Sequence, residues 1–212
     1  MDGTIPELAL KSYMVRRHKL VELHQNLDFL DTTGKVVLLT KSKVFVDRQV
    51  VETVDGKVVC TVTHKVLSVF QVYEIHDGDK DGRVTAVIKM QPTLRGFFGG
   101  SKLDIQDADG SVIAVANGNF YGMEYSIQTQ SGDGIATVTR KYDVMSVSDF
   151  VDTMKNAYMV NISGTQLPTQ TILGFVIVVE ILLARAQSNQ GGIMGAGGGF
   201  GMPGMGMPGG GL

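Results

Sequence analysis

The residues best placed to bind a metal form the acidic run Asp77-Gly-Asp79-Lys-Asp81-Gly82. Carboxylates at alternate positions before a glycine are also how a calcium-binding EF-hand loop begins. That loop needs a bidentate carboxylate at its twelfth position, which is Ile88 here, and a helix on either side. Because the flanking residues read as strands, the run predicts an acidic hairpin turn, with weak calcium binding as the alternative.

A second candidate is the segment from Leu94 to Lys102, in which Phe97 and Phe98 stand between glycines and two cations. Exposed aromatic rings can insert into a bilayer interface while Arg95 and Lys102 pair with lipid phosphates. The segment lacks the Gly-Lys-Ser/Thr ending of a nucleotide-binding loop, which argues against a nucleotide. The simpler interpretation is a crossover loop whose phenylalanines pack on the protein.

The densest basic cluster is formed by Arg16, Arg17 and Lys19. Near an anionic membrane, each such residue contributes about 1 kcal/mol of binding free energy. The simpler interpretation is a solvated face, or arginines that pair with nearby acids. Together with the aromatic segment, this cluster gives the candidate lipid- or anion-binding residues: Arg16, Arg17, Lys19, Arg95, Phe97, Phe98 and Lys102.

Residues suited to catalysis are sparse. The four histidines lack the spacing of a metal site, and one cysteine cannot build a structural zinc site. Cys60 lies among valines, where a thiol is expected to be an inert core residue. Thioethers of Met202, Met205 and Met207 could bind Cu(I), but the low complexity around them is a simpler explanation. The sequence therefore predicts no catalytic residue, metal or cofactor, and no enzyme.

Composition limits the class of partner and the compartment. The chain carries 19 basic and 21 acidic residues, and its net charge of −2 gives no reason to expect nucleic acid. A single cysteine favours a reducing compartment, and the N-terminal residues lack the features of a secretory signal. We therefore expect a cytoplasmic protein.

The elements that must position these residues are short strands joined by Asp/Gly turns. Glycine supplies the positive φ of a tight hairpin, and the runs between the turns alternate apolar and polar residues. About a dozen antiparallel strands follow, and so long a meander avoids exposed edges only by closing into a barrel. The turns recur at Asp31–Gly34, Val54–Gly56, Asp77–Gly82, Asp107–Gly110 and Ser131–Gly134.

An apolar helix is expected to fill this barrel, which is too wide for its own side chains. Ile172 to Ala184 is apolar on every side except at Glu180, and such a helix must be buried in protein or in lipid. About 13 residues rise roughly 20 Å, against about 30 Å of hydrocarbon in a bilayer. Length and the charge of Glu180 favour burial in protein, so no transmembrane span is expected. Arg185 is assigned to the last helical turn, where a cation suits the helix dipole.

Two regions follow from this organisation. Residues 1–188 are predicted to form one barrel domain, with the central helix at about 171–186. Residues 189–212 are rich in Gly and Met, have little to pack, and are expected to form a disordered tail.

In their order along the chain, four segments followed by the apolar helix resemble the LURP-one-related family: Tyr13–Lys19, His64–Val69, Val72–Ile75 and Gly118–Phe120. That family is related to tubby C-terminal domains and to phospholipid scramblases. The resemblance implies a mostly β fold, a closed tubby-like barrel of about 12 antiparallel strands around a buried C-terminal helix. It also implies links to stress or defence responses, and phosphoinositide binding by analogy with tubby.

The leading hypothesis is a non-enzymatic module that binds membrane phospholipid or a protein partner, cytoplasmic or peripheral at a membrane. One alternative is a scramblase-like protein, integrated in the membrane, that moves lipid; an uncharacterised enzyme is a third possibility. The polar stretch before the helix, residues 163–171, lacks the acidic side chains that scramblases carry there. This departure argues against calcium-driven lipid movement.

Overall fold

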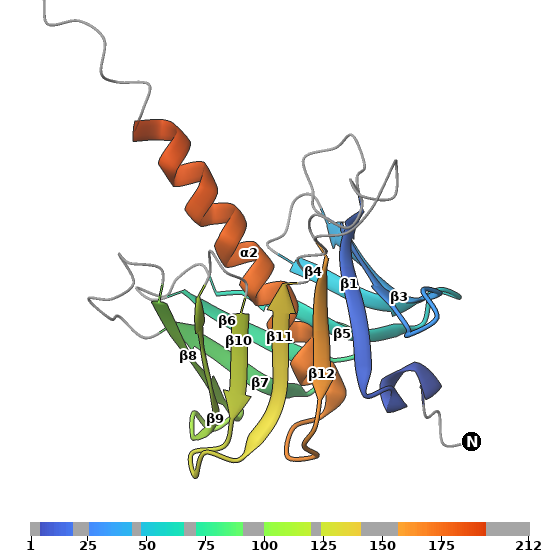
Figure 1. Ribbon diagram of the computed structural model, residues 1–212, viewed down its shortest axis with the longest axis horizontal. Coiled ribbons are helices and arrows are strands. Elements are labelled where there is room, and N and C mark those ends of the chain that lie inside the picture. Colours follow the sequence, from blue (N-terminus) through green and yellow to red (C-terminus); the bar gives the residue numbers. More distant parts are fainter. Residues whose placement is uncertain are drawn as a thin grey trace, which may run out of the picture.

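The computed structural model describes residues 5–18, 26–43, 48–65, 71–90, 100–119, 124–140 and 157–193. Its strands form one closed barrel, in which every strand pairs antiparallel with its sequence neighbours and β12 pairs with β1 to complete the ring (Figure 1). The predicted closed antiparallel barrel around a C-terminal helix is confirmed. The elements are η1 (Pro6–Ala9), β1 (Ser12–His18), β2 (Asn26–Leu30), β3 (Val36–Lys43), β4 (Arg48–Thr53), β5 (Val58–His64), β6 (Val72–Asp77), β7 (Val84–Met90), β8 (Gly100–Gln106), β9 (Val112–Asn119), β10 (Glu124–Gln128), β11 (Gly134–Arg140), β12 (Tyr158–Ile162) and α2 (Thr169–Ile193).

The alternation read from the sequence sets which face of each strand points inward. Ile88, Leu103, Ile105 and Ile127 are at most 1% exposed and belong to a single core. Strand β5 departs from the one-sided pattern, because both of its faces are buried. The reason is the turn after β6, which folds back over the outside of β5, where the Thr61 hydroxyl donates to the Gly78 carbonyl at 2.8 Å.

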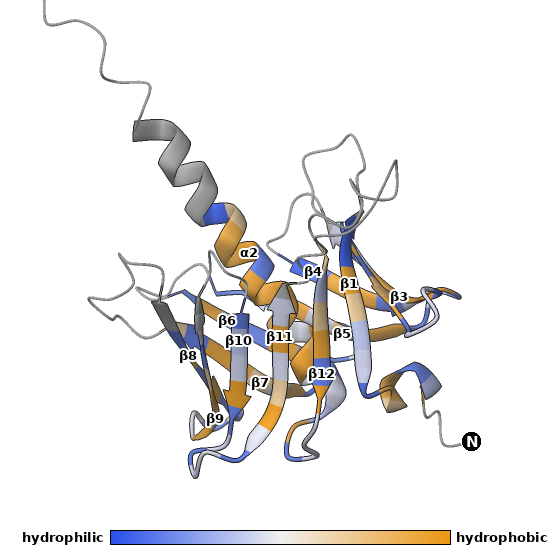
Figure 2. Cartoon of the chain, in the orientation of Figure 1, coloured by the Kyte–Doolittle hydropathy of each residue, from blue (hydrophilic) through white to orange (hydrophobic). Residues whose placement is uncertain are grey.

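Helix α2 fills the barrel, as expected for a ring too wide for its own side chains. Every residue from Ile172 to Val179 is buried, and Figure 2 shows the apolar colouring of α2 along its passage through the barrel. Gly174 allows a close approach, since a Cβ atom there would lie 2.8 Å from Cδ1 of Ile75. The helix extends beyond the expected range at both ends, from Thr169 to Ile193. Within the described ranges, no helix combines the length and apolarity needed to cross a bilayer.

The connections between strands lie alternately at the two ends of the barrel. The five Asp/Gly turns lie at one end, here called the hairpin end, together with η1 and the start of α2 (Figure 1). At the opposite end the odd-numbered strands finish, the even-numbered strands begin and α2 leaves the barrel. This is called the helix-exit end.

Four of the five turns at the hairpin end share one geometry. In each, a backbone N–H of the first residue donates to the carbonyl four residues later, and a glycine at the fourth position has positive φ. The side-chain oxygen of the first residue also accepts a hydrogen bond from the backbone N–H of the fifth residue; for example, Asp107 Oδ1 accepts from Ser111 at 2.9 Å. The four turns begin at Asp31, Thr53, Asp107 and Thr129.

Candidate functional site

The topology brings both candidate segments to the helix-exit end. Arg16 and Arg17 lie near the end of β1, and Lys102 lies near the start of β8. Lys19, Arg95, Phe97 and Phe98 lie outside the described residues. The strand ends that flank them, of β1, β2, β7 and β8, all belong to the helix-exit end.

Arg16 and Lys102 are on the outside of the barrel. Nε of Arg16 lies 3.1 Å from Oδ2 of Asp28 on β2, and about a third of the arginine side chain, 34%, is exposed. Lys102 is exposed on β8, opposite Asn117 of β9. Of the described candidates, these two therefore have cationic groups that a surface could reach.

Arg17 points the other way, into the barrel, and meets Glu180 of α2. Nε of Arg17 lies 2.7 Å from Oε2 of Glu180, and Nη2 lies 3.3 Å from Oε1, so the contact is bidentate. Burial by itself lowers the pKa of Arg17, but the hydrogen bonds and charge of Glu180 outweigh it and raise that pKa. The carboxylate is 4% exposed, and the pair joins β1 to the centre of the helix. Arg17 is therefore committed to the interior rather than to a ligand.

Tyr158 of β12 lies beside this ion pair. Burial raises the pKa of its hydroxyl, and the negative charge of Glu180 raises it further. The phenol therefore stays neutral at physiological pH. The sequence showed Glu180 as a lone acid in an apolar run, but not its partner Arg17, which comes from the opposite end of the chain.

A second polar contact involves Arg185, His64 and Tyr73. Nη1 of Arg185 donates to the Tyr73 hydroxyl at 3.0 Å and lies 3.3 Å from Nε2 of His64. The guanidinium also lies over the Tyr73 ring, 5.8 Å from its centroid. The assignment of Arg185 to the last helical turn is wrong, because the helix continues to Ile193. The side chain instead ties α2 to β5 and β6.

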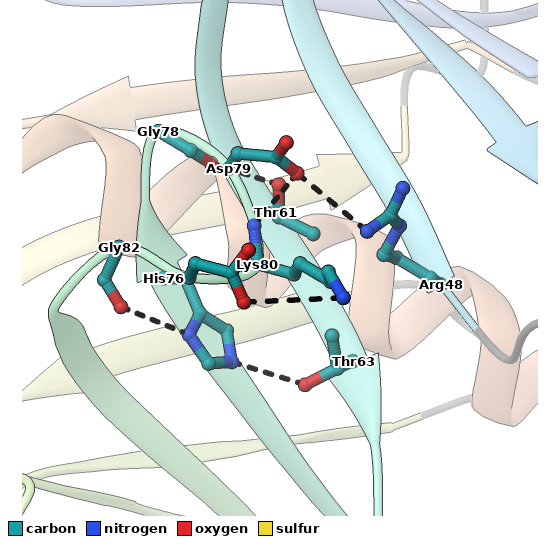
Figure 3. A network of polar contacts seen from close by, with 9 residues as sticks. Arg48, Thr61, Thr63, His76, Gly78, Asp79, Lys80 and Gly82 are labelled. Carbon is teal, nitrogen blue, oxygen red and sulfur yellow. Dashed lines mark hydrogen bonds and ion pairs between the residues drawn. The ribbon is translucent and has the colours of Figure 1, made fainter.

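The acidic run forms the predicted hairpin turn, between β6 and β7. The turn contributes to a network of polar contacts on the outer wall of the barrel (Figure 3). In this network, Asp79 Oδ1 lies 3.5 Å from Nη1 of Arg48 on β4. His76 extends the network, with Nδ1 3.3 Å from the Gly82 carbonyl and Nε2 3.1 Å from the Thr63 hydroxyl. Among the described residues, no group of three or more His, Cys, Asp or Glu side chains is arranged to hold a metal ion.

Cys60 lies inside the barrel and is fully buried. Burial raises the pKa of its thiol to about 12, and the charge of Asp77 adds to the shift. Since the thiolate is the reactive form, this thiol is inert at neutral pH. Its environment matches the expected core role.

Charge is distributed unequally between the two ends. The five turns of the hairpin end, residues 31–35, 54–57, 77–83, 107–111 and 129–133, contain eight aspartates but only four basic residues. In the three residues of each strand nearest the helix-exit end, eight basic residues occur with three acids, Asp28, Glu74 and Glu124. The basic residues are Arg16, Arg17, Lys41, Lys43, Arg48, Lys89, Lys102 and Arg140. Among them, Arg17 is already paired with Glu180 and Arg48 with Asp79, and the excess of basic residues remains without them.

Comparisons with known proteins agree with this architecture. A family model described as LURP-one-related matches residues 11–180. Among solved structures, the X-ray structure of a protein from Arabidopsis thaliana is similar, with a TM-score of 0.57 and 13% sequence identity. That alignment covers 84% of this chain and 96% of the other, and at such low identity it bears on the fold alone. No curated protein matches the chain.

Proposed function

The chain belongs to the LURP-one-related family, and we propose that it is a non-enzymatic module whose helix-exit end docks on anionic membrane phospholipid, phosphoinositide in particular. The observation that carries the proposal is the unequal distribution of charge between the two ends of the barrel. The described strand ends at the helix-exit end are rich in Lys and Arg, whereas the hairpin turns are rich in Asp. A membrane with anionic headgroups would attract the first end and repel the second.

The arrangement supports docking through several weak contacts rather than one deep site. Arg16 and Lys102 project from the outer surface, and each basic residue near an anionic surface contributes about 1 kcal/mol. The segment with Phe97 and Phe98 joins two strand ends at this same end, where aromatic rings would add interfacial binding. Because the ring of strands is closed, these groups would be held on a rigid support.

Burial of α2 supports docking over membrane insertion. The apolar run Ile172–Val179 is enclosed by strands, and the acid that follows it, Glu180, is neutralised by Arg17. Drawing this helix into lipid would expose the barrel interior and break a buried ion pair. A protein partner with an acidic surface would fit the same basic end, and is one outcome of the test below.

Co-sedimentation with vesicles tests the proposal. Phosphatidylcholine vesicles with and without a phosphoinositide would be compared, using the wild type and the variant Arg95→Gln with Lys102→Gln. Because each cation contributes about 1 kcal/mol, loss of two should weaken binding to the phosphoinositide vesicles by about 30-fold. The matched control removes two exposed lysines from the hairpin end, Lys35→Gln with Lys57→Gln, and should bind as the wild type does.

Two results would contradict membrane docking by this end. One is an equal loss of binding in the two double variants, which would indicate a general effect of net charge. The other is the absence of phosphoinositide-dependent binding in the wild type, which would leave an acidic protein partner as the use of the basic end. Binding should also weaken as salt is raised, because exposed charges are screened.

A further inference from the structure

The pairing of β1 with β12, here called the seam, closes the ring of strands. Every other pairing joins strands that follow one another in the sequence, whereas the two strands of the seam lie near opposite ends of the chain. The register of the seam runs from Ser12 opposite Asn161 to Val15 opposite Tyr158. A short connection keeps two neighbouring strands close even when their hydrogen bonds open. The seam is therefore where the ring can open without separating the two strands of a hairpin.

At the hairpin end, the seam is held by direct contacts between its two sides. The Ser12 hydroxyl donates to Oδ1 of Asn161 at 2.9 Å. Just beyond this pair, the Ile162 N–H donates to the carbonyl of Lys11 at 2.8 Å. This end of the seam is therefore secured without any contribution from the helix.

At the helix-exit end, the seam is bridged through the helix instead. Arg17 lies two residues beyond the last pair of the register, and its guanidinium makes the bidentate contact with Glu180 of α2. Tyr158, the seam residue of β12 at this end, lies beside the same carboxylate, whose charge helps to raise the pKa of its hydroxyl. Glu180 is therefore next to side chains from both strands of the seam.

The helix itself is fixed to the opposite wall of the barrel. The backbone of α2 lies closest to β5, β6 and β7, and in the ring β6 and β7 are opposite the seam. Gly174 packs against Ile75 of β6 with no room for a methyl group. The contact between Glu180 and Arg17 therefore connects the wall that holds the helix with the strand that closes the ring.

We propose that the seam is the line along which the barrel opens at its helix-exit end, and that Glu180 holds it closed through Arg17. Without the carboxylate, the guanidinium of Arg17, whose side chain is 20% exposed, is a mostly buried charge with no counter-ion. Movement of β1 away from β12 brings water to that charge and leaves every hairpin intact. Such a local opening requires less free energy than global unfolding.

The asymmetry of the seam sets the direction of opening. Ser12 and Asn161 continue to hold the hairpin end, so the strands separate first at the helix-exit end. The opening gives access to the interior of the barrel beside α2. It is a property of the free chain, so the inference does not depend on membrane docking.

Hydrogen exchange of the full chain, followed by mass spectrometry, tests the role of Glu180. In Glu180→Gln the volume is kept, but the charge and one of the two acceptor oxygens are lost. Amides of β1 and β12 should exchange at least about 10-fold faster than in the wild type, while those of β8 and β9 should not change. Glu52→Gln is the matched control, because it removes the same charge from another buried acid, which pairs with Lys41 on the outer wall. This control should leave exchange at the seam unchanged.

A disulfide across the seam provides an independent test. Met14 and Met159 are directly opposite each other, and they project outward because their neighbours Tyr13 and Val160 belong to the core. Opposed residues of antiparallel strands have the Cα separation that a disulfide needs. Oxidised Met14→Cys with Met159→Cys should return the seam of Glu180→Gln to the wild-type exchange rate, and reduction should make exchange fast again.

Three results would overturn the proposal. Equal acceleration of β8 and β9 in Glu180→Gln would mean that the ion pair stabilises the whole barrel rather than the seam. An equal effect of Glu52→Gln would indicate that any buried acid matters in the same way. The third is seam exchange that the disulfide does not slow. If Glu180→Gln does not fold, the disulfide in the wild-type background decides, since it should slow exchange at the seam and leave β8 and β9 unchanged.

Discussion

At the hairpin end of the barrel, four of the five turns are short and satisfy their own hydrogen bonds, whereas at the helix-exit end the contacts that hold α2 join residues far apart in the chain. The turn at Asp31 is typical of the first kind, because its carboxylate accepts the N–H groups of Thr33 and Lys35. Arg17 and Glu180 are typical of the second, since 163 residues separate them. The difference suggests that the hairpin end determines the fold locally, while the helix-exit end is where the fold is assembled.

The two ends also differ in how they hold the helix. Inside the barrel, α2 is packed by apolar contacts so close that Gly174 meets Ile75 without room for a methyl group. Toward its exit, α2 is held by Arg17 through Glu180, and by Tyr73 and His64 through Arg185. Packing of the first kind is insensitive to pH and salt, whereas contacts between charged side chains can respond to both.

The largest effect should come from breaking the ion pair at the helix-exit end. Glu180→Ala leaves the mostly buried Arg17 without its carboxylate, and loss of one partner of a buried pair costs about 3 to 5 kcal/mol. Urea unfolding followed by circular dichroism measures the change. The double variant Arg17→Met with Glu180→Leu replaces the pair by apolar side chains and should recover most of the lost stability. A loss below about 1 kcal/mol in Glu180→Ala would mean that the pair does not hold the helix.

This ion pair also marks the limit of prediction from the sequence. Strand alternation, Asp/Gly turns and the apolar run of α2 are local patterns, and each is readable because its cause lies within a few residues. Arg17 could only be assigned to a basic cluster, because nothing within β1 names Asp28 as the partner of Arg16 or Glu180 as the partner of Arg17. Alternation along β1 separates the two, but the acid that each one meets depends on closure of the barrel.

The structure differs from the sequence-based expectation at two other places. Burial of Thr61 on the outer face of β5 results from the turn at Asp77–Gly82, whose length gives no sign that it folds back over a neighbouring strand. The helix continues through Gly191 and Gly192, whose poor helix propensity favours a tail from residue 189. The burial of Thr61 therefore depends on an arrangement beyond the local sequence, and nothing in the structure explains the extension of the helix through the two glycines.

A second prediction tests the packing that holds the first half of α2. Gly174→Ala would place its Cβ 2.8 Å from Ile75 Cδ1, and overpacking should outweigh the better helix propensity of Ala, for a net loss of about 1 to 2 kcal/mol. In an Ile75→Ala background the obstacle is removed, so the same substitution should become neutral or stabilising. Urea midpoints of the four proteins give this double-mutant cycle. Equal effects of Gly174→Ala in both backgrounds would show that the contact with Ile75 is not the constraint.

A third prediction concerns the backbone of the hairpin end. Gly110 has φ +88, and no atom lies within 4 Å of the position that a Cβ would take, so Gly110→Ala adds only the backbone cost of positive φ, about 1 kcal/mol. Gly134 also has open space around it but no positive φ, and Gly134→Ala should leave the urea midpoint nearly unchanged. Similar losses in both variants would mean that turn geometry is not what requires glycine at Gly110.

The smallest effect should be an acid sensitivity that originates at the hairpin end. Hydrogen bonds from Thr33 lower the pKa of Asp31, and those from Thr53 lower the pKa of Asp55. A carboxylate with a lower pKa in the folded state binds fewer protons than in the unfolded state. Its stabilisation is complete above the unfolded value of about 3.9 and is lost as the pH falls through the folded value.

Asp31→Asn with Asp55→Asn should therefore flatten the decline of the urea midpoint below about pH 4 and have its main cost at neutral pH. Asp81→Asn is the matched control, because this exposed carboxylate belongs to the one turn with a different geometry. If the double variant and the wild type lose stability in parallel between pH 6 and pH 3, the acid sensitivity must originate elsewhere. Asp31 and Asp55 would then contribute no measurable part of the acid sensitivity, and the contrast between the two ends of the barrel would not extend to protons.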